Sequence, residues 1–177
     1  MSQLVFITGN TDKFSWTQRY LSLPLTHKKL DLEEVQSLDP HVVIEHKVKE
    51  AYNILQQPVL VEDTSLIFHA LGRLPGTFIK WFIEDLGNEG LCNLLKDDRD
   101  ATAIVIFGYY DGKKLLYGEG RTKGTIAAKP RGKNGFGWDP IFIPEGQNKT
   151  HAEMTVEEMD PINLRRFAIE DLEQKLR

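Results

Sequence analysis

Apolar and polar residues follow one another along the chain in short blocks, whose period switches between that of strands and that of helices. Residues 3–8 form a β-rich apolar run that Gly9 ends, and Phe14, Trp16 and Leu21 then recur at helical spacing. The start of the chain is therefore predicted to be a strand, a tight turn and a helix.

The same two periods predict most of the remaining elements. They indicate strands at residues 25–32, 59–61, 101–110 and 115–119, and helices from Val43 to the proline at 58, at 78–86, at 91–95 and after Pro161. Glu62 and Asp63 would then lie at the C-terminal end of a buried strand. Asp111 and Gly112 signal a hairpin turn between the last two strands.

The C-terminal region predicts two helices, and the whole pattern predicts a fold class. Thr155 and Glu158 fit a capping box that opens a first helix, and Pro161 breaks it before a last helix with one apolar face formed by Ile162, Ile169, Leu172 and Leu176. Alternating strands and helices followed by a long hairpin predict an α/β or mixed α+β fold around an extended sheet. We expect one domain over residues 1–177, or two lobes that share a core, with the substrate cleft between the lobes.

Composition narrows the classes of function. A chain of 177 residues, 41% of them hydrophobic, can bury about 70% of its unfolded surface in one domain. A net charge of −4 argues against holding nucleic acid or a membrane by long-range positive potential, so any phosphate site must be local. We expect no secretory signal and no membrane span, and we expect the single cysteine, Cys92, to be buried in a helix of a cytoplasmic protein.

The first candidate site is the turn from Thr8 through Gly9 and Asn10 to Lys13. At a strand-to-helix turn, free backbone N–H groups and the positive end of the helix dipole favour an anion, and Lys13 adds a charge about one turn into the helix. An ordinary turn with an asparagine cap is the alternative. It is not a Walker loop, because the glycine spacing and the Lys-Ser/Thr pair are missing.

The second candidate site contains carboxylates. Because a strand alternates its side chains, Glu62 and Asp63 should point to different sides unless the strand has bent. Mg²⁺ takes oxygen ligands, usually one or two carboxylates with substrate phosphates and waters, and Glu33 or Glu34 after the second strand can supply another carboxylate. Solvated loop acids are the alternative.

The third candidate site is the basic, glycine-rich loop at residues 129–140. Its glycines allow close backbone approach, Phe136 can stack on a purine, and Asp139 can accept a hydrogen bond from a ring N–H. In the alternative interpretation, Phe136 and Trp138 pack down onto the hydrophobic core and cover it. Three cationic residues can add charge to the same site or lie as solvated helix-face residues: Lys80, Arg165 and Arg166.

Taken in order, these segments resemble the inosine triphosphate pyrophosphatase family, also called the Ham1 family, over almost the whole chain. The matching segments are Thr8-Gly9-Asn10 with Lys13, Leu30-Asp31-Leu32-Glu33-Glu34, Val61-Glu62-Asp63-Thr64-Ser65-Leu66, Leu74-Pro75-Gly76 with Ile79-Lys80-Trp81-Phe82, Gly135-Phe136-Gly137-Trp138-Asp139-Pro140, and Thr150-His151-Ala152-Glu153-Met154. Each match is weak alone, and the six together in the family's order are specific.

The resemblance implies an elongated α/β fold with a central twisted sheet, two lobes around a deep cleft, and usually a homodimer. It implies hydrolysis of non-standard purine nucleoside triphosphates (ITP, dITP, XTP) to the monophosphate and pyrophosphate with Mg²⁺, which cleanses the nucleotide pool. The resemblance implies that phosphates are held by Thr8, Gly9, Asn10 and Lys13, and that Mg²⁺ and the attacking water are managed by Glu34 and Asp63. It also implies that Phe136 stacks on the base and that the base pocket is shaped by Trp138 and Asp139. Lys80 would sit beside the substrate.

One stretch departs from the family pattern. Members usually carry a Lys-Asn pair and then Ser-His-Arg at the start of the last helix, where the His and Arg contact a 6-oxo purine. Residues 159–165 retain only the arginine, as Arg165, with Asn163 and Leu164 before it. Two alternatives to the family's activity therefore stay open: a catalytically weak nucleotide-binding homologue, and a pyrophosphatase with a different base preference.

Overall fold

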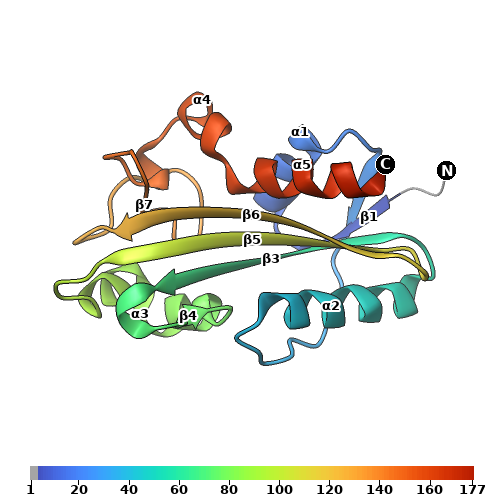
Figure 1. The fold of residues 1–177 in the computed structure, drawn as a ribbon, viewed down its shortest axis with the longest axis horizontal. Helices are drawn as coiled ribbons and strands as arrows, with labels where there is room; N and C mark the ends of the chain where they lie inside the picture. Colours follow the sequence, from blue (N-terminus) through green and yellow to red (C-terminus); the bar gives the residue numbers. More distant parts are fainter. Residues whose placement is uncertain (1–3) are drawn as a thin grey trace. The chain divides into compact units, whose positions relative to one another are not determined.

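The computed structural model describes residues 4–177 and shows a mixed α/β fold around one sheet, which confirms the expected fold class (Figure 1). Gln3, which the pattern includes in the first strand, lies outside the described residues. In chain order the elements are β1 (Leu4–Ile7), α1 (Thr11–Tyr20), β2 (Leu25–Lys28), α2 (Pro40–Leu55), β3 (Val59–Phe68), β4 (Pro75–Gly76), α3 (Ile79–Asn93), β5 (Asp100–Tyr110), β6 (Leu115–Ile126), β7 (Phe142–Pro144), α4 (Val156–Met159) and α5 (Leu164–Leu176).

The seven strands form one sheet. Its order is β2-β1-β3-β5-β6-β7, and β4 pairs with β3 outside this path. By its internal contacts the chain divides into two compact units: unit 1 comprises Met1–Asp63, Val105–Gly120 and Leu164–Arg177, and unit 2 comprises Thr64–Ile104 and Arg121–Asn163. The strands β3, β5 and β6 therefore each have residues in both units. The single domain over residues 1–177 and the cleft between lobes remain predictions.

Unit 1 is built on parallel strands. β1 pairs in parallel with β2, where Val5 lies opposite Thr26, and with β3, where Val5 lies opposite Val59. All four residues of β1 are buried, as expected of a strand covered on both faces. Figure 1 shows α1 and α5 on one side of these strands and α2 on the other.

Two glycines let α5 approach β6 closely in unit 1. A Cβ atom at Gly118 would lie 2.1 Å from the carbonyl oxygen of Ala168, and one at Gly120 would lie 2.1 Å from that of Leu164. Only glycine leaves room for the helix backbone at these positions. The strand predicted at 115–119 continues to Ile126, where residues 124–126 pair with β7, and glycines interrupt its hydrophobic pattern.

Unit 2 contains α3, which carries the predicted break between two helical stretches. Gly87 has a φ of 65° and a ψ of 173°, so the helical conformation is interrupted there, between the two stretches expected at 78–86 and 91–95. Cys92 is buried in this helix, as expected. Arg99 donates hydrogen bonds to the carbonyl oxygens of Leu95 and Ile126, which ties the end of α3 to β6. Within residues 4–177, no helix is long and apolar enough to span a bilayer.

Other predicted boundaries were also wrong. β3 does not end before the acids but runs on to Phe68, so Glu62 and Asp63 lie in the middle of the strand. β2 ends at Lys28, short of residue 32. The last helix begins at Leu164, and the residue assigned to its apolar face at 162 lies instead in a 3-10 turn.

Candidate functional site

The turn between β1 and α1 has the geometry of a capped helix start. The side-chain oxygen of Asn10 accepts hydrogen bonds from the backbone N–H groups of Asp12 at 2.9 Å and Lys13 at 3.0 Å, and the Thr8 hydroxyl accepts one from the Asn10 N–H at 3.0 Å. The asparagine-capped turn that the sequence offered as one alternative is therefore present. The same turn also places Lys13 beside the positive end of the α1 dipole, where an anion is favoured.

Glu62 joins this turn to the last helix. Its Oε1 atom lies 3.0 Å from the Lys13 ammonium and 2.9 Å from Nη2 of Arg165, and its Oε2 atom accepts from Nε of Arg165 at 3.0 Å. Only 1% of the Glu62 side chain is exposed. Burial alone would raise the pKa of Glu62, but the charges of Arg165 and Lys13 lower it, so the carboxylate stays ionised.

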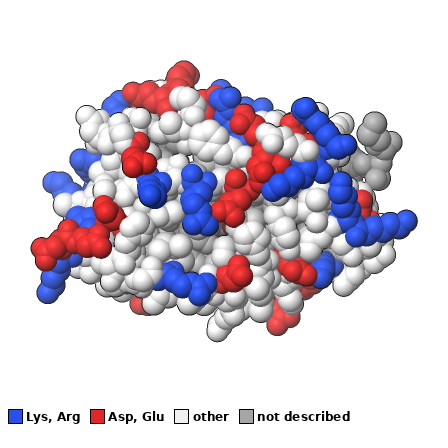
Figure 2. Space-filling view, viewed as in Figure 1, with Lys and Arg blue, Asp and Glu red and all other residues white. Residues whose placement is uncertain are grey.

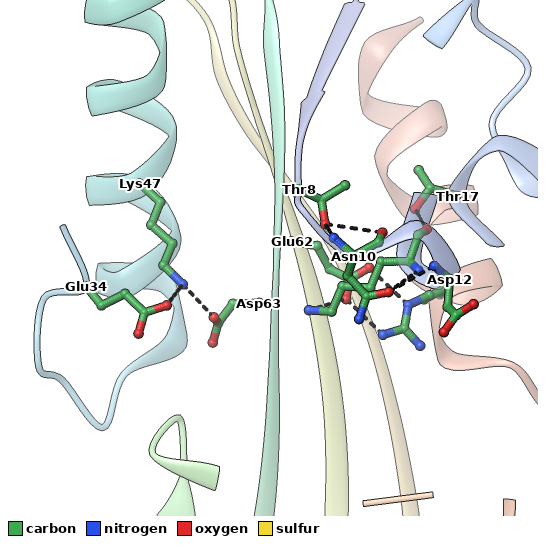
Figure 3. A network of polar contacts seen from close by, with 10 residues as sticks. Thr8, Asn10, Asp12, Thr17, Glu34, Lys47, Glu62 and Asp63 are labelled. Atoms are coloured by element: carbon green, nitrogen blue, oxygen red, sulfur yellow. Dashed lines mark hydrogen bonds and ion pairs between the residues drawn. The ribbon is translucent and has the colours of Figure 1, made fainter. Parts of the chain in front are cut away.

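Asp63 belongs to a different cluster, as the alternation of side chains along a strand requires. The Lys47 ammonium donates to Asp63 Oδ1 at 2.9 Å and to Glu34 Oε1 at 3.4 Å. Figure 3 shows this cluster on one side of β3, and Glu62 with the β1–α1 turn on the other. The structure therefore brings the two predicted metal ligands, Glu34 and Asp63, together through one lysine.

Lys47 was missed by the sequence analysis, although the sequence contains a signal for it. It lies on α2 at the same helical spacing as Ile44, Val48 and Ala51, all of them fully buried. A lysine on an otherwise apolar helix face needs a partner, because a buried charge is costly when unpaired. Burial alone would lower the pKa of Lys47, but the carboxylates of Asp63 and Glu34 raise it.

The carboxylate cluster has unused capacity for a cation. Oδ2 of Asp63 is buried and accepts no hydrogen bond from any residue in the described part of the chain. Burial raises the pKa of Asp63, and the Lys47 charge opposes that shift. Glu33, the other acid considered, is largely exposed, so Glu34 is the better partner. Within residues 4–177, no three His, Cys, Asp or Glu side chains gather as a ready metal cage.

The loop around Phe136, in unit 2, is organised from inside by Asp139. Its Oδ2 atom accepts from the backbone N–H of Phe136 at 2.8 Å, and its Oδ1 atom lies 3.3 Å from Nδ1 of His151. A Cβ atom at Gly135, where φ is 72°, would lie 2.2 Å from that Oδ2. Both oxygens thus stabilise the loop that presents the half-buried Phe136 ring, and glycine is required for the tight turn.

Trp138 lies in the hydrophobic core of unit 2. It is 9% exposed, and its ring packs edge-on against Phe142 at 5.5 Å between centroids. The backbone N–H groups of Lys133 and Asn134 both donate to the carbonyl oxygen of Ala152 at 3.0 Å, which fixes the start of the loop. The core-lid alternative therefore describes the packing of Trp138, and its role in a base pocket remains a prediction.

The remaining cations differ in their surroundings. Lys80 is exposed on α3, with its ammonium 4.9 Å from the ring centre of Trp81. Arg166 pairs with Glu170 on the surface of α5 at 2.8 Å, whereas Arg165 one residue earlier turns to Glu62. On the face shown in Figure 2, acidic and basic side chains are interspersed.

Comparison with known proteins gives consistent matches. The sequence pattern of the Ham1 family matches residues 4–175. The "Inosine triphosphate pyrophosphatase" of Yarrowia lipolytica is 46% identical over 176 residues, covering 96% of this chain and 93% of that protein. The protein of the same name from Batrachochytrium dendrobatidis is 49% identical over 160 residues, covering 87% and 83%. A HAM1 protein structure from Coxiella burnetii superposes with a TM-score of 0.86 at 28% identity, covering 99% of this chain and 98% of the other.

Proposed function

Because this chain belongs to the Ham1 family, we propose that it hydrolyses non-standard purine nucleoside triphosphates (ITP, dITP and XTP) to the monophosphate and pyrophosphate. The observation that carries the proposal is the 46% identity to an inosine triphosphate pyrophosphatase over 96% of the chain. The chemistry of the candidate residues agrees with it, since one cluster suits an anion and another a cation.

In this proposal, the turn formed by Thr8, Gly9 and Asn10 binds phosphate oxygens. The N-terminal end of α1 favours negative charge there, and Lys13 adds a positive charge that offsets the charge of the leaving pyrophosphate. Phosphoryl chemistry depends mainly on such positioning and charge stabilisation.

Glu34 and Asp63 are the residues proposed to hold Mg²⁺. Two observations support the fit: an ammonium group already bridges the two carboxylates, and Asp63 Oδ2 is a buried oxygen with no partner in the described chain. When bound, Mg²⁺ supplies positive charge against the phosphate oxygens. Asp63 itself, buried beside the Lys47 ammonium at 2.9 Å, is proposed to orient a water and accept its proton.

The loop of residues 129–140 is proposed to bind the base. Phe136 stacks on the purine, Asp139 keeps the loop in shape, and Trp138 and Lys80 contribute to the pocket. A 6-oxo purine accepts at O6 and donates at N1, whereas adenine reverses both, so a donor aimed at O6 leaves adenine poorly paired. Such an interaction is worth about 1–3 kcal/mol in a desolvated site.

A second candidate is a homologue with weak hydrolysis or with another base preference. The observation that favours it is Leu164, which is 4% exposed in the core and has no side-chain donor for a base edge. It stands where family members usually have histidine. Arg165 alone remains from that motif, and it is engaged by Glu62.

A pyrophosphate-release assay with Mg²⁺ over ITP, XTP, dITP, GTP and ATP separates the candidates. Release from ITP, dITP and XTP at least tenfold faster than from GTP and ATP is the expected result. A different ranking supports altered base preference, and binding without release supports the weak homologue. Repeating the assay with EDTA, and then with Mg²⁺ or Ca²⁺ restored, tests the metal: full activity in EDTA contradicts the assignment of Glu34 and Asp63.

The homodimer and the cytoplasmic location also remain part of the proposal. Light scattering on the purified protein checks the first. A mass of one chain, 20.3 kDa, would contradict it.

A further inference from the structure

We propose that His151 is a positioning residue for the base: its imidazole fixes the Asp139 carboxylate, which in turn fixes the backbone that carries Phe136. The inference rests on the proposed function, because it concerns the stacking of Phe136 on a purine. It gives a role to a buried histidine that belongs to one of the matching sequence segments and had no role of its own there.

The Asp139 carboxylate is held at both of its oxygen atoms. Oδ2 accepts from the Phe136 N–H at 2.8 Å, and Oδ1 lies 3.3 Å from Nδ1 of His151. The last torsion of an aspartate side chain has a broad energy minimum, so one hydrogen bond alone leaves the carboxylate free to turn. The second contact comes from a histidine whose side chain is only 6% exposed, and it keeps Oδ2 directed at Phe136.

The imidazole is itself held in place by its surroundings in unit 2. His151 begins the 3-10 turn His151–Glu153, which has a capping box formed by Thr150 and Glu153. Its ring packs against two aromatic rings, with its centroid 5.7 Å from that of Trp138 and 5.2 Å from that of Phe142. The position of Nδ1 is therefore set by the turn and by core packing.

The second nitrogen of the ring indicates that packing alone does not account for a histidine here. Nε2 is buried and has no hydrogen-bond partner among residues 4–177. An ionised carboxylate only accepts hydrogen bonds, so the Nδ1 that faces Asp139 carries the proton, and Nε2 is the acceptor of the neutral ring. A buried acceptor without a partner is unfavourable, and a phenylalanine ring would avoid it. What histidine adds over phenylalanine is its contact with Asp139.

The loop needs such support because glycines flank its aromatic ring. Gly135 has a φ of 72° and Gly137 has a φ of 61°, and glycine gives the backbone on both sides of Phe136 wide conformational freedom. Ordering a flexible loop during binding lowers affinity. A loop that Asp139 and His151 already order presents the ring with a smaller loss of entropy, which affects nucleotide binding and leaves the chemistry at the phosphates unchanged.

Two variants separate the hydrogen bond from the packing. His151→Phe keeps a ring against Trp138 and Phe142 but loses the donor, whereas His151→Asn loses the ring but has an NH₂ group bonded to Cγ, as Nδ1 is. His151→Phe is expected to raise the KM for ITP at least about threefold, the effect of one hydrogen bond, and by more than it lowers kcat. His151→Asn should give a lower KM than His151→Phe. A folded His151→Phe protein with a smaller rise in KM, or a KM of His151→Asn that is equal or higher, overturns the proposal.

A ligand without a base and a second histidine serve as controls. Calorimetric binding of inorganic tripolyphosphate by His151→Phe should stay within twofold of wild type, and a greater loss overturns the proposal. His69→Phe removes another histidine contact in unit 2, that of Nε2 with the Thr102 hydroxyl at 2.9 Å, and should leave the KM for ITP within twofold of wild type. A rise in this control as large as that in His151→Phe overturns the proposal, because the effect would then not depend on the Asp139 contact.

A spectroscopic measurement on the wild type requires no variant to fold. Nitrogen NMR of labelled protein in mildly alkaline buffer distinguishes protonated from unprotonated ring nitrogens, and His151 is expected to carry its proton on Nδ1. A ring without a proton on Nδ1 overturns the proposal. If His151→Phe does not fold, this measurement decides.

The two proposals fail in distinguishable ways. Wild-type protein that releases no pyrophosphate from any of the five nucleotides overturns the proposed activity, and the calorimetric affinity for ITP then replaces KM under the same limits. Wild-type protein that hydrolyses ITP, together with an unchanged KM in His151→Phe, overturns the role of His151 alone.

Discussion

Asp63→Asn replaces a buried carboxylate by an amide of the same shape, and it should separate catalysis from stability. In the wild type, Asp63 Oδ1 accepts from the Lys47 ammonium at 2.9 Å, and Oδ2 has no partner in the described chain. The asparagine oxygen can still accept from Lys47. The negative charge is lost, however, and with it the capacity to hold a cation or to accept a proton from water.

The structure indicates a smaller effect of Asp63→Asn on stability than on catalysis. Two unit charges 2.9 Å apart attract by about 6 kcal/mol at an effective dielectric constant of about 20, before the cost of burying them. Burial nevertheless raises the pKa of Asp63, so ionised Asp63 is less favourable in the folded chain than in the unfolded one. A neutral residue avoids that penalty, but the Lys47 ammonium then loses the charge of its nearest carboxylate and keeps Glu34 at 3.4 Å, so we expect the free energy of unfolding to fall by about 1–3 kcal/mol.

The expected effect on catalysis is much larger. Removing a group that orients and deprotonates water lowers turnover by about 10² to 10⁴-fold, which corresponds to about 3–5 kcal/mol of transition-state stabilisation. Pyrophosphate release from ITP measures this loss, and urea unfolding measures stability. The control is Asp97→Asn, which changes an exposed aspartate. More than a tenth of wild-type turnover in Asp63→Asn would refute the role of Asp63, and a stability loss above about 3 kcal/mol would refute the reasoning from its pKa.

Three further predictions follow from the ion cluster and the base loop. Because the pKa of Glu62 is lowered from 4.5, the contribution of its ionised carboxylate to the free energy of unfolding is fully present above that pH and is lost as the pH falls. The free energy of unfolding of Glu62→Gln should therefore depend less on pH in acid than that of the wild type. Equal slopes of this free energy against pH would contradict the prediction. Gly132→Ala should lower the free energy of unfolding by about 2 kcal/mol in urea titrations. The reason is that φ at this residue is +83° and the new Cβ atom would lie 2.2 Å from the carbonyl group of Ala152. An unchanged free energy of unfolding would show that the loop relaxes around the Cβ atom. Phe136→Ala should raise the KM for ITP about 5- to 100-fold, since stacking of a base on an aromatic ring is worth about 1–3 kcal/mol. The affinity for inorganic tripolyphosphate, which has no base, should stay constant. An equal loss of affinity for ITP and for tripolyphosphate would place the ring near the phosphates.

Features that depend on near neighbours were predictable from the sequence. The capping box of Thr155 and Glu158 is present, with the Thr155 side chain accepting from the Glu158 N–H. The hairpin turn is also present, with Asp111 accepting from the N–H groups of Lys113 and Lys114 and Gly112 at a φ of 93°. In each case the interacting atoms lie within four residues, so the local sequence specifies both partners.

Strand lengths depended on the tertiary structure. β3 continues through its acids because a partner exists for each: cations for Glu62 on one side, and Lys47 for Asp63 on the other. The hydrophobic pattern alone predicts that a buried strand ends at an acid, because the partners of the acid come from other parts of the chain. β6 continues past residue 119 because its residues 124–126 pair with β7, and its glycines at 118 and 120 leave room for the backbone of α5.

The sequence by itself determined which residue types are available for the chemistry: a capped turn with a lysine, adjacent acids on a strand, and an aromatic ring between glycines. Only the tertiary structure decided their partners, because Glu62 and Arg165 are 103 residues apart in the chain. Whether a buried charge is tolerated depends on the charges packed against it. Those neighbours come from elements that folding brings together, so local sequence patterns do not specify them.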